Sequence, residues 1–116
     1  MNSEELKAVR LFFDFDIESE AARFIAADNE HKKGVKRQSW QRWEKGAYRI
    51  PEGIVKNIED ILARRSKFLN YILEQGIKEI RIPYDIQEKD PLEFKIQRSV
   101  IYELYIKGVI RISDKQ

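Results

Sequence analysis

The hydrophobic positions near the N-terminus follow a helical period in two successive segments. In residues 3–13, apolar side chains recur three, six and seven positions after Leu6, which predicts a helix that Ser3 can cap. The period then breaks at a short acidic turn. Asp16 suits the N-cap of a second helix over residues 17–26, where apolar side chains again return at spacings of three and four.

A third, short helix is predicted over residues 36–45. Trp40 and Trp43 lie three positions apart in it and therefore share one face. We expect both rings to lie in the core. Gly46 should end this helix, because a residue just past a helix end often needs a positive φ, and Pro51 suits the first turn of the next helix.

The second half of the chain changes from a helical period to an alternating one. Residues 54–75 carry apolar side chains at spacings of three, four and seven, which predicts one long helix or two helices with a joint near residues 64–66. Alternation then predicts a strand over residues 78–84. A helix over residues 93–107 and a second strand over residues 109–112 follow. The sequence therefore predicts a mainly α fold with a small β element.

These elements divide the chain into a helical bundle over residues 1–65 and an α+β half over residues 66–116. The second half is short for an independent core. Its helix is apolar on nearly all sides, and such a helix must be covered on most of them. We expect a second copy of the chain to cover the side chains beyond its main stripe, and these are Ile96, Val100, Tyr102 and Ile106.

The composition narrows the class of protein. Charged residues make up 36% of the chain, against about a quarter in an average protein. The absence of cysteine excludes a disulfide framework and a thiolate metal site. The chain has no run of about eighteen or more apolar residues, and its N-terminus is polar and acidic, unlike a secretory signal. We expect a cytoplasmic protein without a membrane partner.

The sequence contains no spacing that is typical of a catalytic or metal centre. Acidic residues and tyrosines are common, but none forms a nucleophile–base pair or a ligand set. The single histidine, His31, lies in a polar, turn-rich segment over residues 27–34 and is expected to be a surface loop residue. We therefore expect no enzymatic activity, no cofactor and no metal.

Positive charge is concentrated around the third predicted helix. Residues 32–49 contain seven cations and one anion, a net charge of +6, which leaves −4 for the remainder of a chain whose net charge is +2. A solvated charged face is the simpler interpretation of each cation alone. A single-sign segment against an acidic body is more typical of a nucleic-acid footprint.

Residues 36–45 are therefore interpreted as the recognition helix of a helix-turn-helix domain that binds double-stranded DNA. Arginine can donate two hydrogen bonds to guanine, and glutamine can pair with adenine. The side chains on the N-terminal and outward part of the helix, which would meet base edges, are Arg37, Gln38, Gln41 and Arg42. Those placed for phosphates are Lys36, Ser39, Lys45, Arg49 and, from the basic loop over residues 28–34, Lys33.

The order of these helices resembles the lambda-repressor-like (Cro-type) DNA-binding domains. The segment Gln38-Ser39-Trp40-Gln41-Arg42-Trp43-Glu44-Lys45-Gly46, followed by Ile50-Pro51, is similar to that family's signature at the end of the recognition helix. Arg10 is a cation beside the apolar stripe of the first helix. The resemblance implies that Arg10 and Glu44 form the buried, structural arginine–glutamate pair of that family.

A second resemblance covers nearly the whole chain. Residues 2–10, 39–46, 50–51, 97–100 and 103–105 resemble the anti-CRISPR-associated repressors of the second family and their bacterial relatives. The resemblance implies an N-terminal helix-turn-helix and a C-terminal dimerisation half. It also implies a bacterial or phage-encoded homodimer that represses its own anti-CRISPR operon by binding inverted repeats in the promoter. This sequence departs from the family in the loop over residues 28–34 and in a shortened connection near residues 85–91.

Two other functions stay open from the sequence. The same basic face could bind RNA and act as a post-transcriptional autoregulator, although no RNA-specific signature such as an aromatic platform on a sheet is present. The chain could also be an antitoxin or adaptor whose C-terminal half binds another protein. The operator, the regulated genes and any effector are not specified by these patterns.

Overall fold

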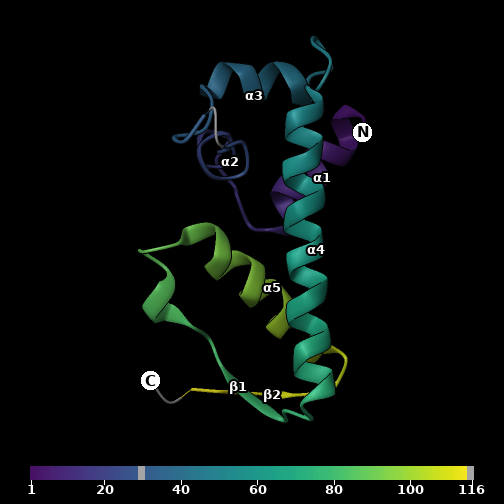
Figure 1. Ribbon diagram of the computed structural model, residues 1–116, viewed down its shortest axis with the longest axis vertical. Helices are drawn as coiled ribbons and strands as arrows, with labels where there is room; N and C mark the ends of the chain where they lie inside the picture. The colour runs from purple at the N-terminus through teal and green to yellow at the C-terminus, as the bar shows by residue number, and fades with distance from the viewer. Residues whose placement is uncertain (29–30, 115–116) are drawn as a thin grey trace. The chain divides into compact units, whose positions relative to one another are not determined.

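The computed structural model describes residues 1–28 and 31–114 of the chain, and its elements are shown in Figure 1. In chain order they are α1 (Ser3–Phe12), α2 (Glu18–Phe24), α3 (Arg37–Glu44), α4 (Glu52–Glu74), β1 (Glu79–Arg81), the 3-10 helix η1 (Tyr84–Ile86), α5 (Pro91–Ile106) and β2 (Arg111–Ser113). The predicted fold class, mainly α with a small β element, is confirmed.

The chain forms two compact units, Met1–Asp60 and Ile61–Gln116. The boundary falls inside α4, slightly before the predicted division between residues 65 and 66. This helix is continuous over 23 residues, so it has no joint near residues 64–66. Among the described residues, no helix is both long enough and apolar enough to cross a membrane.

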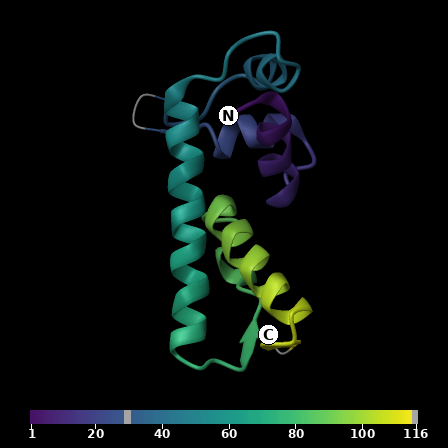
Figure 2. The ribbon, with the colours of Figure 1, turned by 90° about the vertical axis from the view of Figure 1, so that its right-hand side faces the viewer.

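The first unit is built from α1, α2, α3 and the beginning of α4 (Figure 2). Both α1 and α2 pack against α3. Ala21 and Ala22 are fully buried on α2, and their small side chains let the neighbouring backbone approach closely. The larger core side chains of this unit are Leu6, Phe13, Phe15, Ile25, Trp40, Trp43, Ile50, Ile54 and Ile58.

The N-caps of α1 and α2 each lie one residue away from the predicted N-cap. Asn2, not Ser3, caps α1: its side chain accepts the backbone N–H of Glu5 at 2.8 Å, and Glu5 accepts the N–H of Asn2 at 2.8 Å. The N-cap of α2 is Ile17, which makes no side-chain capping bond. The predicted cap Asp16 lies just outside the helix, and its carbonyl oxygen accepts a hydrogen bond from Arg10 at 3.1 Å.

The second unit contains a two-stranded parallel sheet whose strands are connected through η1 and α5. A parallel pair needs a crossover of this kind, whereas a tight turn would give an antiparallel pair. Ile80 is paired with Ile112 in the register. The side chain of Asp90 caps α5 by accepting the N–H of Glu93 at 3.1 Å, and Pro91 occupies the first turn, where a missing N–H has no cost.

The core of the second unit gathers residues from α4, from α5 and from the positions next to the two strands. Its buried members are Ile72, Ile82, Phe94, Val100, Ile101, Leu104 and Ile110. Ile96 is also fully buried. The prediction that Ile96 and Val100 lie on a free apolar face for a second copy is therefore wrong, because the chain itself leaves neither side chain any exposed surface. Tyr102 and Ile106, from the same predicted set, are 47% and 79% exposed.

Candidate nucleic-acid interface

A buried ion pair fixes α3 in the first unit. Arg10 donates from Nε to Oε2 of Glu44 at 2.6 Å and from Nη2 to Oε1 at 3.0 Å. The two side chains are only 8% and 7% exposed. Trp40 donates from Nε1 to the same Oε2. The predicted pair is thus formed, and the carboxylate of Glu44 serves as acceptor for both an arginine and a tryptophan.

The remaining donors of Arg10 bind the turn between α1 and α2. Its Nη1 donates to the carbonyl oxygens of Phe15 at 2.9 Å and Asp16 at 3.1 Å. The hydrogen bond to Glu44 is the largest influence that raises the pKa of Arg10, and it outweighs the opposing effect of burial. Because each charge is paired and hydrogen-bonded, a cation can lie in the interior and hold α1, the turn and α3 together.

The face of α3 that points inward is aromatic. Trp40 is fully buried and Trp43 is 9% exposed, which confirms the prediction that both are core residues. Their ring centroids are 6.0 Å apart, with the planes tilted by 59°. The carboxylate of Glu44 lies on the same inner side of α3 as these two rings. Among the predicted base-contacting residues, Arg37, Gln38 and Arg42 are exposed and Gln41 is half-buried.

The start of α3 is electropositive. Its N-cap is Lys36, which makes no side-chain capping bond, and its first turn holds no acidic residue. Free N–H groups and the helix dipole place partial positive charge at this end, and anions are favoured there. Lys36 and Arg37 add full positive charges at a place where they do not stabilise the helix itself. The arrangement favours a polyanionic partner.

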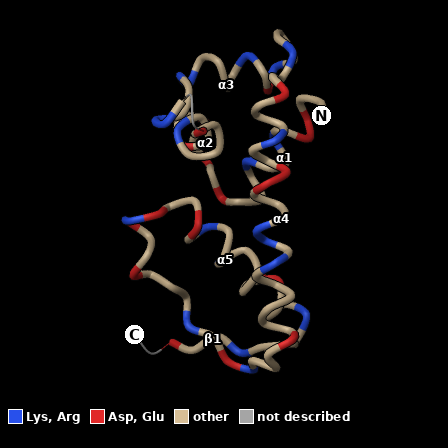
Figure 3. Tube along the Cα trace, viewed as in Figure 1, with Lys and Arg blue, Asp and Glu red and all other residues tan. Residues whose placement is uncertain are grey.

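The other predicted phosphate-contacting residues lie on α3 or in the segments before and after it. Lys33, Lys45 and Arg49 are exposed, and Ser39 is half-buried. Figure 3 shows that Lys and Arg prevail over Asp and Glu along α3 and the segments next to it, whereas α1 carries both signs. The unit thus brings the predicted cations onto α3 and its two flanking loops.

The described residues of the basic loop before α3 include a short turn and a glycine. Asn29 and Glu30 lie outside the described residues. His31, an exposed loop residue as predicted, donates its N–H to the side chain of Asp28 at 2.6 Å. Gly34 has a φ of +80° and follows this turn. Val35 then donates to the carbonyl oxygen of Ala22 at 2.9 Å, which attaches the loop to α2.

Tyr48 lies beside the predicted nucleic-acid surface but is not among the residues predicted for it. The ring of Tyr48, in the loop after α3, lies 5.4 Å from Cζ of Arg42. The sequence pattern predicts Gly46 as a helix stop. An exposed aromatic residue two positions after such a stop is the signal that could have indicated this contact, because the chain turns back toward the helix there.

In the second unit, Arg65 of α4 holds α5. It donates from Nε to Oγ of Ser99 at 2.9 Å and from Nη2 to Oε1 of Glu103 at 2.7 Å. The hydrogen bonds from Lys107 and Arg65 hold the pKa of Glu103 below its usual range.

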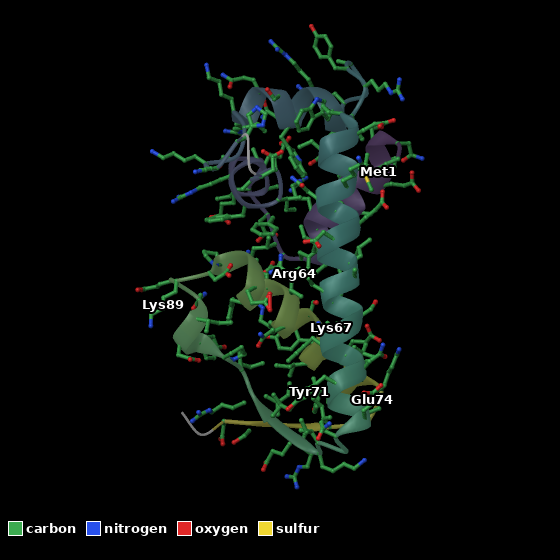
Figure 4. The ribbon with its side chains drawn as sticks, viewed as in Figure 1. Met1, Arg64, Lys67, Tyr71, Glu74 and Lys89 are labelled. Atoms are coloured by element: carbon green, nitrogen blue, oxygen red, sulfur yellow. The ribbon has the colours of Figure 1, made fainter. Side chains whose placement is uncertain are left out.

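Figure 4 labels Lys67, Tyr71 and Glu74, which line an open depression on the second half of α4. The described residues contain no group of three His, Cys, Asp or Glu that could hold a metal ion.

The fold and this surface define a small two-unit protein whose first unit exposes cations on α3 and on the segments next to it. The Aca2/YdiL-like family model matches residues 1–112, and the chain belongs to that family. The chain is also 31% identical, over 124 aligned positions, to a protein of Escherichia coli (strain K12) named "Uncharacterized protein YdiL". That alignment covers 97% of this chain and 99% of the relative. Membership confirms the resemblance to the anti-CRISPR-associated proteins and is consistent with a regulatory role.

Proposed function

We propose that the protein is a sequence-specific DNA-binding transcriptional repressor in which α2 and α3 form a helix-turn-helix and α3 is the recognition helix. The observation that carries this proposal is the division of α3 into two faces. Trp40 and Glu44 fix its inner face to the rest of the unit. The outer face offers Arg37, Gln38 and Arg42 to solvent. A rigid helix with free bidentate donors is suited to reading base edges in a major groove.

The cations on both sides of α3 would set the position of the protein along the duplex by contacting phosphates. Lys33 and Lys36 precede the outer face of α3, and Lys45 and Arg49 follow it. Phosphate contacts from both ends would orient the helix, while the base contacts between them supply the sequence preference. Each phosphate neutralised releases counterions, so binding should weaken steeply as salt is raised.

The operator is proposed to be an inverted repeat bound by a homodimer. One recognition helix contacts only a few base pairs, which gives little selectivity against a genome of competing sites. Two copies on a two-fold axis double the contacts and require a palindromic site. The exposed residues Tyr102 and Ile106 at the end of α5 supply apolar surface for such an association. Family membership supports an anti-CRISPR operon as the regulated unit, in the cytoplasm of a bacterial host.

The decisive experiment is selection of duplexes from a random pool by the purified full-length protein. We expect enrichment of an inverted repeat whose half-site centres lie about one helical turn, or a multiple of it, apart. Arg42→Ala should weaken this enrichment and relax the preference at the base pair that Arg42 reads. Lys67→Ala removes one exposed cation from α4 in the second unit and serves as the matched control. A pool that shows no enriched motif, with tight binding to hairpin RNA instead, would replace this proposal by RNA binding.

A further inference from the structure

The loop after α3 is folded back on the helix that it leaves. Gly46 has a φ of +74°, a conformation that glycine adopts readily. The next two amides, of Ala47 and Tyr48, both donate to the carbonyl oxygen of Arg42, at 3.0 and 3.4 Å. The backbone of the loop is therefore attached to the residue whose side chain points out of α3.

The far end of the same loop is anchored as well. Ile50 is 8% exposed and belongs to the core of the first unit. Pro51 accepts the N–H of Ile54 at 3.1 Å, which starts α4. Tyr48 thus lies between two fixed points, although its own side chain is 59% exposed. Burial in the core does not explain the position of this ring.

The contact that the ring makes is with a cation. Cζ of Arg42 lies over the ring of Tyr48, 5.4 Å from its centroid. A guanidinium group is attracted to an aromatic face by the ring quadrupole and can stack on it as a plane. Stacking uses the face of the guanidinium and leaves its edge, which carries the N–H donors, free to bind a planar acceptor.

We infer that Tyr48 is a positioning residue for Arg42, and that this pair sets the preference for guanine at one position of the operator. An unrestrained arginine side chain must give up substantial rotamer entropy when it makes a bidentate contact. A ring that already holds the guanidinium group reduces that loss and restricts the directions in which its N–H groups can point. The O6 and N7 atoms of guanine form the matching pair of acceptors. This inference rests on the function proposed above.

The first test needs no nucleic acid. A ring beside Arg42 shifts the NMR signals of the arginine side-chain protons upfield. We expect this shift in the wild type and in Tyr48→Phe, which keeps the aromatic face, and its loss in Tyr48→Leu. Equal shifts in the wild type and Tyr48→Leu would overturn the stacking. Thermal melting of each variant checks that the unit still folds.

The second test measures discrimination between bases. The probes are the duplex that the wild type enriches and derivatives of it in which one G·C pair at a time is replaced. Tyr48→Leu should reduce discrimination at the pair read by Arg42 by about two- to fivefold, the equivalent of an exposed cation–π contact. Discrimination at other pairs and the salt slope should not change. Tyr48→Phe should behave as the wild type.

A double-mutant comparison separates this role from a direct contact of the tyrosine. In an Arg42→Ala background, Tyr48→Leu should cause no further loss of discrimination, because the residue it positions is gone. If Tyr48→Phe instead weakened binding to all duplexes as much as Tyr48→Leu, the hydroxyl would be a phosphate ligand and the inference would be wrong. If the wild type enriched no duplex, the proposed function and the specificity role would both fall, and the NMR shift would still decide the stacking.

Discussion

Gly34 lies directly against the backbone of Ala22: a Cβ atom at position 34 would stand only 2.2 Å from the carbonyl oxygen of Ala22 and 2.6 Å from Cα of Arg23. The same carbonyl oxygen accepts the N–H of Val35. This contact connects the basic loop to α2 just before α3 begins. The position therefore requires glycine for two independent reasons, the positive φ of +80° and the lack of space.

Gly34→Ala should destabilise the first unit by more than the roughly 1–3 kcal/mol that a strained backbone conformation costs alone, because backbone atoms must also move apart. Chemical denaturation of the full chain measures the free energy of unfolding. Gly53→Ala is the matched control. Gly53 lies in the first turn of α4 with nothing near its missing Cβ, so alanine there should be neutral or stabilise by up to about 1 kcal/mol. Similar stability changes in the two variants would contradict this account.

Arg10→Met should destabilise the first unit by about 3–5 kcal/mol, because the carboxylate of Glu44 is then left buried without its cation. The double variant with Glu44→Met should recover part of the loss. Lys107→Met is the control, since Lys107 is paired with Glu103 but its side chain is 63% exposed. An exposed pair of this kind contributes at most about 1 kcal/mol. An Arg10→Met melting temperature equal to that of the wild type would show that the pair has no structural role.

The elements that the sequence predicted well are those whose pattern is local. The two tryptophans, the helix stop at Gly46 and the long α4 each follow from residues close in sequence. The pairing of Arg10 with Glu44 joins positions far apart, and it was predicted only because a cation beside an apolar stripe matched a known family pattern. The hydrogen bond from Arg10 to the carbonyl oxygen of Asp16 depends on tertiary packing and does not follow from a local pattern. The N-cap of α2 lies one residue after the predicted Asp16.

The partners that bury α5 could not be predicted from a local pattern. A helix that is apolar on nearly all sides indicates that it must be covered, but not by what. Ile72, Ile82 and Ile110 come from three other parts of the chain and contribute to the core that contains Val100. Assigning that side chain to a second copy was wrong for this reason. The contact of Tyr48 with Arg42 was missed because it depends on how the loop after α3 closes.

The stability of the second unit should decrease as the pH falls below the usual range of a glutamate. Hydrogen bonds from Lys107 and Arg65 lower the pKa of Glu103 in the folded state relative to the unfolded state. A depressed folded pKa contributes stability that is present above the unfolded pKa of about 4.5 and is lost as the pH falls through the folded value. Glu103→Gln should reduce this acid dependence, as measured by denaturant unfolding at a series of pH values. An unchanged dependence would assign the acid sensitivity to other carboxylates.

Arg42 and Lys45 should affect duplex binding in different ways. Arg42→Ala should weaken binding to the selected duplex by about 1–3 kcal/mol and relax its sequence preference, because a bidentate base contact is lost. Lys45→Ala should weaken binding to all duplexes alike and reduce the salt slope by about one. Titrations of selected and scrambled duplexes at several salt concentrations measure both quantities. If Lys45→Ala changed the sequence preference and left the slope intact, its assignment to phosphate would be wrong.

Ile106→Lys should convert the proposed homodimer to a monomer without unfolding the chain. Ile106 is 79% exposed at the C-terminal end of α5, so a lysine there has water around it in the single chain and places a charge in any apolar interface formed by that surface. Sedimentation at micromolar concentration should give a dimer mass for the wild type and a monomer mass for the variant. Leu11→Lys changes an equally apolar residue that is 50% exposed in the first unit, and it should leave the dimer intact.

Because two recognition helices act together on an inverted repeat, the monomeric variant should also bind the selected duplex far more weakly while retaining the melting temperature of its core. A wild type that sediments as a monomer would remove the two-fold axis from the proposal and with it the reason to expect a palindromic operator.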